Sequence, residues 1–545
     1  MTIFKKDLNK YYTLFFLLAI SFLLTIDNFS LQSAINSGLI LSSEVTYPNQ
    51  FTNVSVAHFN SWTSLHHLTL ILIKIKINIF IISKILIYIS TVFFSFGIFL
   101  LTFSITRSYT LALALVCFLL IGKLNFGNLD YPALIYFEHT YGMFSFSTFT
   151  IFIGLLFNKN LRLAGFFLIL LISVHIVIGT WVLFLLTLIY FYSTYISKSK
   201  ILEKKLIINF LKGFFFGLIP IVFSFLYHRK NIIAKGDFDV NNYNLYMSLW
   251  DTHRNVHDIN YVYIFLTLAL VIFYFQIFRK LSKEKSYKKF LFFFIITHCF
   301  CSMFLYIMYK LVPNYFPEIL VRGMIARVFL IHTHIGYPLI ISFCYVLIKD
   351  NYYFKSKFYG NIGFVVLVII FASVLFVNKY INRDYVSNKN LYSKILYRVE
   401  SFTKNLSNDL ETDEKKFWSD VNKLNTDGYF VTTSTTSDPT LRFGKKPYLI
   451  NTNYFDHIPY HPHTVDHVKI ILENIYNIKF DNPPIKYLSK IKDEWIIEVF
   501  ENRSQSEWID LGNKYNISGI IVPSNWKIDV INQISSDKYT LYKLK

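Results

Sequence analysis

Long apolar runs recur through the first 378 residues of this chain of 545 residues, and they restrict its possible folds more than any other feature. A helix needs about 20 consecutive apolar residues to cross the hydrocarbon core of a bilayer. Charged residues make up only 16% of the chain, which excludes a fold that is water-soluble throughout. The runs predict a polytopic α-helical membrane protein with about eleven transmembrane helices, near residues 11–26, 85–105, 109–123, 141–157, 161–176, 178–196, 206–227, 261–278, 290–310, 328–348 and 360–378.

The sequence divides into three parts. Residues 1–378 are expected to form the multi-span transmembrane domain, residues 379–424 a mixed-charge helical connector, and residues 425–545 a soluble α/β domain. The α/β assignment rests on strand-like and helix-like segments that alternate. Strands are predicted at 428–434, 447–452, 517–522 and 538–543, and helices at 415–424, 465–476 and 504–515, the last of these capped by Ser506.

The distribution of charge predicts the orientation in the membrane. The net charge is +20, and residues 1–378 hold 31 basic and 13 acidic residues, so the excess belongs to the membrane part and not to a nucleic-acid-binding face. Alternate connections carry 19 basic residues, whereas residues 27–73 carry none. We therefore expect a protein of the cytoplasmic membrane with its N-terminus inside and its C-terminal domain outside. The stretch 65–82 is apolar but contains Lys74 and Lys76, which predicts a helix in the membrane interface.

Groups that bind polar ligands or move protons gather on the predicted outer side. Of the eleven histidines in residues 1–378, only His298 lies in the middle of a predicted span. Most acidic residues of this part also lie in the predicted outer connections. A channel or transporter is expected to place such groups within its spans, so the pattern favours chemistry at the outer surface.

Two carboxylates of the first outer loop are candidate catalytic groups. Asp27 directly follows the first span, and Glu44 lies farther along the same loop. A carboxylate at the membrane surface is suited to act as a general base toward a hydroxyl. Because residues 27–73 lack lysine and arginine, neither carboxylate is expected to have a local salt-bridge partner. The alternative for each is a solvated loop charge.

Further candidates lie in the later outer loops. Glu138 and His139 form a pair that suits binding of a sugar hydroxyl, a metal or a phosphate, or else caps a helix. Arg254, Arg322 and Arg327 are candidates for binding a lipid phosphate, because guanidinium groups match phosphate oxygens. The alternative for Arg322 and Arg327 is an interaction with ordinary lipid headgroups.

No residue is assigned as a metal ligand, although a divalent metal remains an alternative. All four cysteines lie within apolar runs and are expected to be buried and unpaired, which excludes a disulfide framework. The residues His457, His461, His463 and His467 fall within eleven positions of the C-terminal part. They are typical either of a metal site or of a loop packed toward the membrane domain.

The layout resembles the GT-C superfamily of membrane glycosyltransferases, in its uncharacterised bacterial branch. The segments that carry the resemblance are 161–181, 442–451 and 511–523. It implies a GT-C-like fold, a lipid-phosphate-linked sugar donor, and a catalytic acidic residue in the first outer loop. Carried over to this chain, Asp27 or Glu44 would be the base, and Arg322 and Arg327 would hold the lipid phosphate. The adjacent acidic pair common in the first loop of such enzymes is absent here.

The expected function is that of a membrane glycosyltransferase. It would move a sugar from a polyprenyl-phosphate-linked donor to a glycan or lipid acceptor at the outer face, among membrane lipids and without nucleic acid. The alternative is a non-enzymatic transporter or an envelope-polymer assembly protein, ligase- or polymerase-like.

Overall fold

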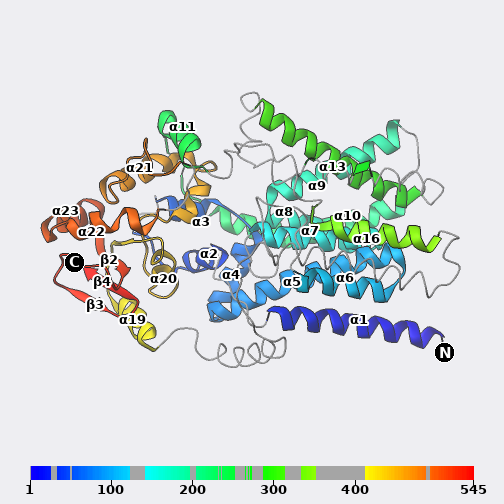
Figure 1. The fold of residues 1–545 in the computed structure, drawn as a ribbon, viewed down its shortest axis with the longest axis horizontal. Helices are drawn as coiled ribbons and strands as arrows, with labels where there is room; N and C mark the ends of the chain where they lie inside the picture. Colours follow the sequence, from blue (N-terminus) through cyan, green and yellow to red (C-terminus); the bar gives the residue numbers. More distant parts are fainter. Residues whose placement is uncertain are drawn as a thin grey trace.

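The structure is a computed structural model. It describes residues 2–25, 33–48, 52–122, 141–196, 204–230, 232–234, 236–251, 264, 268, 271–272, 286–312, 333–350, 412–486 and 491–544. A small α/β unit formed by the C-terminal residues lies at one end of a body of long helices, and the N-terminus lies at the opposite end (Figure 1).

Long apolar helices form the body, as the sequence predicts. Three of the described helices are long and apolar enough to cross a membrane, and they cover Ile79–Thr106, Lys204–Arg229 and Phe293–Leu311. Five shorter apolar helices accompany them. The predicted span at 360–378 lies outside the described residues, and so does most of 261–278. The long helices are α1 (Thr2–Thr25), α5 (Ile79–Thr106), α6 (Tyr109–Gly122), α7 (Tyr141–Phe157), α8 (Leu161–Val174), α9 (Ile176–Phe191), which continues into a π-helical turn over Tyr192–Ile196, α10 (Lys204–Arg229), α13 (Ser286–Leu311) and α16 (Thr333–Asp350).

Much of the predicted first outer loop is helical. It contains α2 (Ser33–Leu41), α3 (Asn53–Asn60) and α4 (Ser64–Lys74). The side chains of Thr52 and Thr63 accept backbone N–H bonds at the starts of α3 and α4, which stabilises short helices. The prediction of one interfacial helix over 65–82 is wrong, because α4 ends at Lys74 and α5 begins at Ile79.

The C-terminal unit contains a four-stranded sheet of order β1-β2-β4-β3, in which β1 and β2 are parallel and the other pairs antiparallel. Alternate side chains of the strands point to opposite faces. Phe430, Ile521 and Leu541 pack against α19, and Val431, Ile520 and Val522 belong to the core on the other face. The elements are α19 (Thr412–Lys423), β1 (Tyr429–Thr432), α20 (Ser437–Arg442), η3 (Thr452–His457), η4 (Pro462–Thr464), α21 (Val465–Asn474), η5 (Asp493–Trp495), α22 (Ile497–Asn502), α23 (Gln505–Tyr515), β2 (Ile517–Pro523), β3 (Gln533–Ser535) and β4 (Tyr539–Lys543).

Two local predictions in this unit are wrong. The segment 447–452 is not a strand, because it meets β1 only at the bridge between Phe430 and Tyr448. Beyond that bridge the Asn451 side chain accepts the Asn453 N–H and starts η3. The cap of α23 is Ser504 rather than Ser506, since Ser504 and Glu507 form a capping box.

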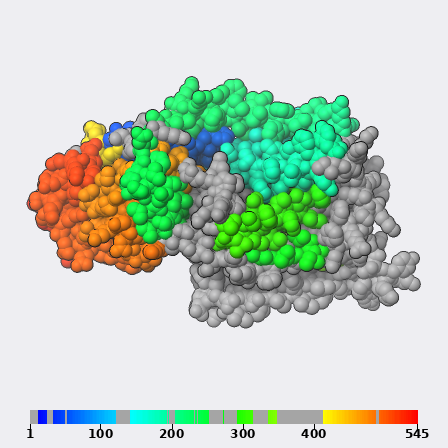
Figure 2. Space-filling view, turned by 90° about the horizontal axis from the view of Figure 1, so that it is seen from above, coloured from blue at the N-terminus to red at the C-terminus, as the bar shows by residue number. Residues whose placement is uncertain are grey.

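The C-terminal unit packs directly against the helical body. One buried hydrophobic core contains side chains of α2, α3, α4 and α11 (Val240–Leu249) together with side chains of the C-terminal unit. Tyr246 donates its hydroxyl to the Phe455 carbonyl at 2.7 Å, and Trp250 donates its indole N–H to the Phe480 carbonyl at 2.8 Å. The close packing of α11 on α21 is visible in Figure 2.

Candidate functional site at the joint

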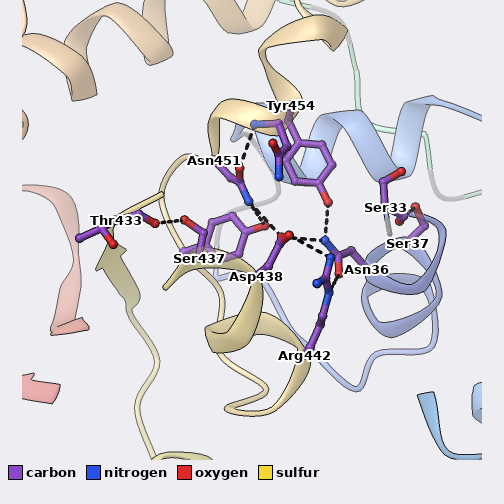
Figure 3. A network of polar contacts seen from close by, with 11 residues as sticks. Ser33, Asn36, Ser37, Thr433, Ser437, Asp438, Arg442, Asn451 and Tyr454 are labelled. Atoms are coloured by element: carbon purple, nitrogen blue, oxygen red, sulfur yellow. Dashed lines mark hydrogen bonds and ion pairs between the residues drawn. The ribbon is translucent and has the colours of Figure 1, made fainter. Parts of the chain in front are cut away.

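A buried polar network joins α2 to the C-terminal unit (Figure 3). Asn36 is 1% exposed. Its amide nitrogen donates to Asp438 at 3.1 Å and to the Tyr454 hydroxyl at 2.8 Å, and its amide oxygen accepts the Arg442 Nε–H at 2.7 Å. Arg442 also pairs with Asp438 at 2.9 Å. Because the charges of Arg442 and Asp438 are paired and hydrogen-bonded, this network fixes α20 against α2 at little cost in unpaired charge.

Histidines occupy the rest of the joint. The Ser37 hydroxyl lies 2.7 Å from His58 Nδ1, and the His58 ring lies edge-on to Tyr454 at 4.7 Å between ring centroids. Burial, followed by the neighbouring His457, lowers the pKa of His58 well below its usual value. His58 is therefore neutral and serves as a hydrogen-bonding group of the joint.

Two of the clustered histidines of the C-terminal unit, His457 and His461, also lie at this joint. The Ser61 hydroxyl lies 3.3 Å from His457 Nδ1 and 3.0 Å from His461 Nε2. Among the described residues, no group of three or more His, Cys, Asp or Glu is arranged to hold a metal ion. Of the two interpretations of this cluster, the described residues favour a loop packed toward the membrane domain.

A cavity of about 590 Å³ opens beside the polar network, between the body and the C-terminal unit. It belongs to the size range of about 300–1,000 Å³ in which small ligands bind. Five basic side chains and a single acidic one, Glu44, line it. The basic residues are Lys76, Lys84, Lys415, Arg442 and Lys445.

Glu44 lies between two of these lysines. Its carboxylate pairs with Lys76 at 2.8 Å through one oxygen and with Lys445 at 3.2 Å through the other. The hydrogen bond from Lys76 and the charge of Lys445 lower the pKa of Glu44 despite its partial burial. Glu44 lacks a partner within the lysine-free stretch 27–73, as expected, but Lys76 and Lys445 from outside that stretch pair with it, so its carboxylate is not free.

Two tight helix ends bring Glu44 and Lys76 together. Ser43 and Lys76 both adopt left-handed backbone, with φ of 64° and 63°. Each follows a helix C-terminus with the paired backbone bonds of a Schellman motif, in which Glu44 N–H reaches the Leu39 carbonyl and Ile77 N–H the Leu72 carbonyl. Glycine usually fills this position, so the sequence gives little indication of either turn.

The cavity lies next to the start of α5, which is long and apolar enough to cross a membrane. Asn78, Ile79, Phe80 and Ile81 at the amino end of α5 all line it. A helix amino end carries partial positive charge and favours anions. Ile81 is 45% exposed, so apolar surface lies beside the cavity.

The third wall of the cavity comes from α19. Lys415, Trp418, Ser419 and Asn422 line it at helical spacing. Trp418 is 2% exposed, and its indole N–H is buried without a hydrogen-bond partner among the described residues. The Trp418 ring therefore contributes apolar surface to this wall, and the polar groups of the wall come from Lys415, Ser419 and Asn422.

Of the predicted site residues, the structure describes only Glu44. Asp27, Glu138, His139, Arg254, Arg322 and Arg327 lie outside the described residues, and their roles stay predictions. No sequence pattern indicated a role for Lys84, Lys415 or Lys445. Lys415 and Lys445 are separated from the α5 segment by more than 300 positions, so no local pattern connects them with the cavity.

No protein-family model matches this chain, and no curated protein matches its sequence. The chemistry of the site is therefore inferred from its own residues.

Proposed function

We propose that this protein is a membrane glycosyltransferase of the GT-C type, which moves a sugar from a polyprenyl-phosphate-linked donor to an outer-face acceptor. The observation that carries the proposal is the cavity of about 590 Å³, with five basic side chains beside the amino end of an apolar helix. A donor of this kind is an anion attached to a long apolar chain. The cavity offers positive charge where the apolar helix α5 begins, and this combination suits such a molecule.

Lys84 is the lysine best placed to hold the phosphate. It lies in the second turn of α5 and is half-buried, and it forms no ion pair with any described residue. Lys76 and Lys445 are already engaged by Glu44. Phosphate held by Lys84 and Lys415 would leave as a stabilised anion when the sugar is transferred.

The general base is proposed to be Asp27, with Glu138 as the next candidate. Glu44 is a poor base, because its pKa is lowered by the lysine contacts and a weakly basic carboxylate takes up a proton less readily. We further propose the larger topology of about eleven spans, with the N-terminus in the cytoplasm and the C-terminal unit outside.

A second candidate is a non-enzymatic protein of envelope-polymer assembly that binds the same lipid. The double ion pair of Glu44 favours it, since the only carboxylate lining the described cavity is occupied. The two candidates differ in whether the bound lipid loses its sugar.

The test is sugar transfer from a radiolabelled polyprenyl-phosphate sugar in membranes that contain the full chain. Lys84→Gln should reduce donor affinity about tenfold to a hundredfold, because a charge-assisted hydrogen bond contributes about 1.5–3 kcal/mol. Asp27→Asn should abolish transfer and leave donor binding intact. Lys74→Gln is the matched control, since Lys74 is an exposed lysine of α4 outside the cavity.

Each contrary outcome has a definite meaning. Donor binding without any transfer by the unmodified protein would favour the assembly protein. Equal effects of Lys84→Gln and Lys74→Gln would remove the cavity from the mechanism. Full transfer by Asp27→Asn would exclude Asp27 as the base and leave Glu138 to be tested.

A further inference from the structure

The cavity is larger than a phosphate group requires. A water-sized group takes up about 30 Å³, so the five heavy atoms of a phosphate fill roughly 150 Å³. The cavity measures about 590 Å³. Most of its volume is therefore left for whatever the phosphate carries.

The remaining walls offer hydrogen-bonding groups. Ser419 and Asn422 contribute a hydroxyl and an amide. Glu44 contributes a carboxylate that can accept more hydrogen bonds than the two it receives, because two carboxylate oxygens have about four lone-pair sites. Such a set of neutral donors and acceptors with one fixed carboxylate matches a group rich in hydroxyls.

The two lysines make Glu44 a fixed acceptor. Lys76 and Lys445 each bind a different oxygen of the carboxylate, and they come from the turn after α4 and from the turn after α20. The side chain is 31% exposed, so it is held at the wall of the cavity and not sealed off. A hydroxyl donates more strongly to an ionised acceptor than to a neutral one.

From this arrangement we infer that the ligand is an amphiphile whose phosphate bears a hydroxyl-rich headgroup. Glu44 accepts hydrogen bonds from the hydroxyls of that headgroup. This inference rests on the proposed function for the lipid carrier, but it assigns Glu44 to recognition instead of proton transfer. Glu44 then determines specificity: it distinguishes a sugar-bearing lipid phosphate from the bare lipid phosphate.

The test compares two affinities of the full chain in phosphatidylcholine nanodiscs. The probes are polyprenyl phosphate with an attached hexose and polyprenyl phosphate alone. The unmodified protein should bind the hexose-bearing lipid more tightly. Glu44→Gln should reduce that preference about tenfold, because a hydrogen bond to a charged group contributes about 1.5–3 kcal/mol and one to a neutral amide about 0.5–1.5 kcal/mol.

The matched control is Asp420→Asn. Asp420 lies on α19 in an exposed pair with Lys423 at 3.3 Å and does not line the cavity, so the same change of carboxylate to amide should leave both affinities unaltered. A merely structural role for Glu44 would weaken both lipids equally in Glu44→Gln and leave the preference unchanged. That result would overturn the inference, and so would an unmodified protein with no preference for the hexose.

A third probe separates the sources of such a headgroup. Phosphatidylinositol presents a hydroxylated phosphate on an ordinary lipid. If phosphatidylinositol competed for binding as strongly as the hexose-bearing lipid does, the inference of a polyprenyl carrier would be overturned. Because these measurements record binding alone, a failure of sugar transfer would contradict the proposed function and leave the role of Glu44 standing.

Discussion

At the scale of single residues, one neutral side chain connects the two parts of the molecule. Asn36 bonds to Asp438, Tyr454 and Arg442, which lie about 400 positions further along the chain. Without the Asn36 amide, the Arg442 guanidinium and the Asp438 carboxylate, which pair with each other, would each lose a hydrogen-bond partner. A buried polar group left unbonded is more costly than the bond itself is favourable.

We therefore expect Asn36→Leu to loosen the joint. Hydrogen bonds to charged groups contribute about 1.5–3 kcal/mol, so backbone amides of α20 should exchange with deuterium about ten to a hundred times faster. Hydrogen exchange followed by mass spectrometry measures this directly. Asn474→Leu is the control, because Asn474 is exposed on α21. Unchanged protection of α20 in Asn36→Leu would show that the apolar core alone holds the joint.

The residue types in the sequence indicated part of this site. Which residues pair with one another could not be predicted from the sequence. Glu44 was identified as a candidate because it is a carboxylate in a stretch without basic residues. Its partners could not be identified, since Lys76 itself occupies a left-handed position that usually holds glycine and Lys445 lies 401 positions away. Ion pairs between distant segments depend on the tertiary fold, which a local pattern does not contain.

At the scale of elements, two glycines show how closely the apolar helices pack. A Cβ at Gly213 of α10 would lie 1.7 Å from the Arg162 carbonyl oxygen, which is backbone of the neighbouring chain segment. A Cβ at Gly217, one turn later, would meet the Cγ2 methyl of the Ile169 side chain at 2.5 Å. Small residues with this spacing are a common means of close helix packing in membranes.

Gly213→Ala should therefore destabilise the protein more than Gly217→Ala. Both substitutions gain the same helix propensity, so their difference reports packing. Overpacking costs about 1–3 kcal/mol, and the cost should be higher at Gly213, where backbone has to move, than at Gly217, where the nearest atoms belong to side chains. The measurement is the midpoint of thermal unfolding of the two variants in detergent. A lower midpoint for Gly217→Ala would contradict the packing argument.

Element types could be predicted in proportion to the strength of the local signal. The apolar runs located α5, α7, α8, α10 and α13 within a few residues, because helices in a bilayer require long uninterrupted apolar sequence. Short helices such as α2, with Ser33, Asn36 and Ser37 among its residues, lack that signal. The segment 447–452 has strand composition, but its single bridge to β1 depends on the neighbouring chain.

At the scale of the whole molecule, the division into a helical body and a C-terminal α/β unit could be predicted from composition. The hydrophobic core that the two parts share could not be predicted in this way. The predicted boundary at residue 425 separates α19 from the sheet that it covers, since Phe417 and Trp418 pack on Phe430 and Leu541. A mixed-charge segment looks like a connector in sequence. The apolar stripe of α19 can be recognised as a packing face only when the sheet that it covers is known.

The orientation in the membrane is the property of the whole molecule that the sequence predicts most directly. Basic residues concentrate in alternate connections, such as 197–205 and 279–289, and basic connections remain on the cytoplasmic side. The N-terminus and the C-terminal unit lie at opposite ends of the molecule (Figure 1). We therefore expect reporters fused after residue 285 and after residue 545 to lie on opposite sides. A fusion after residue 200 is the internal control and should agree with the fusion after residue 285. Reporters at 285 and 545 on the same side would reverse the assignment of the cavity to the outer face, and with it the proposal of a lipid-linked donor used outside the cytoplasm.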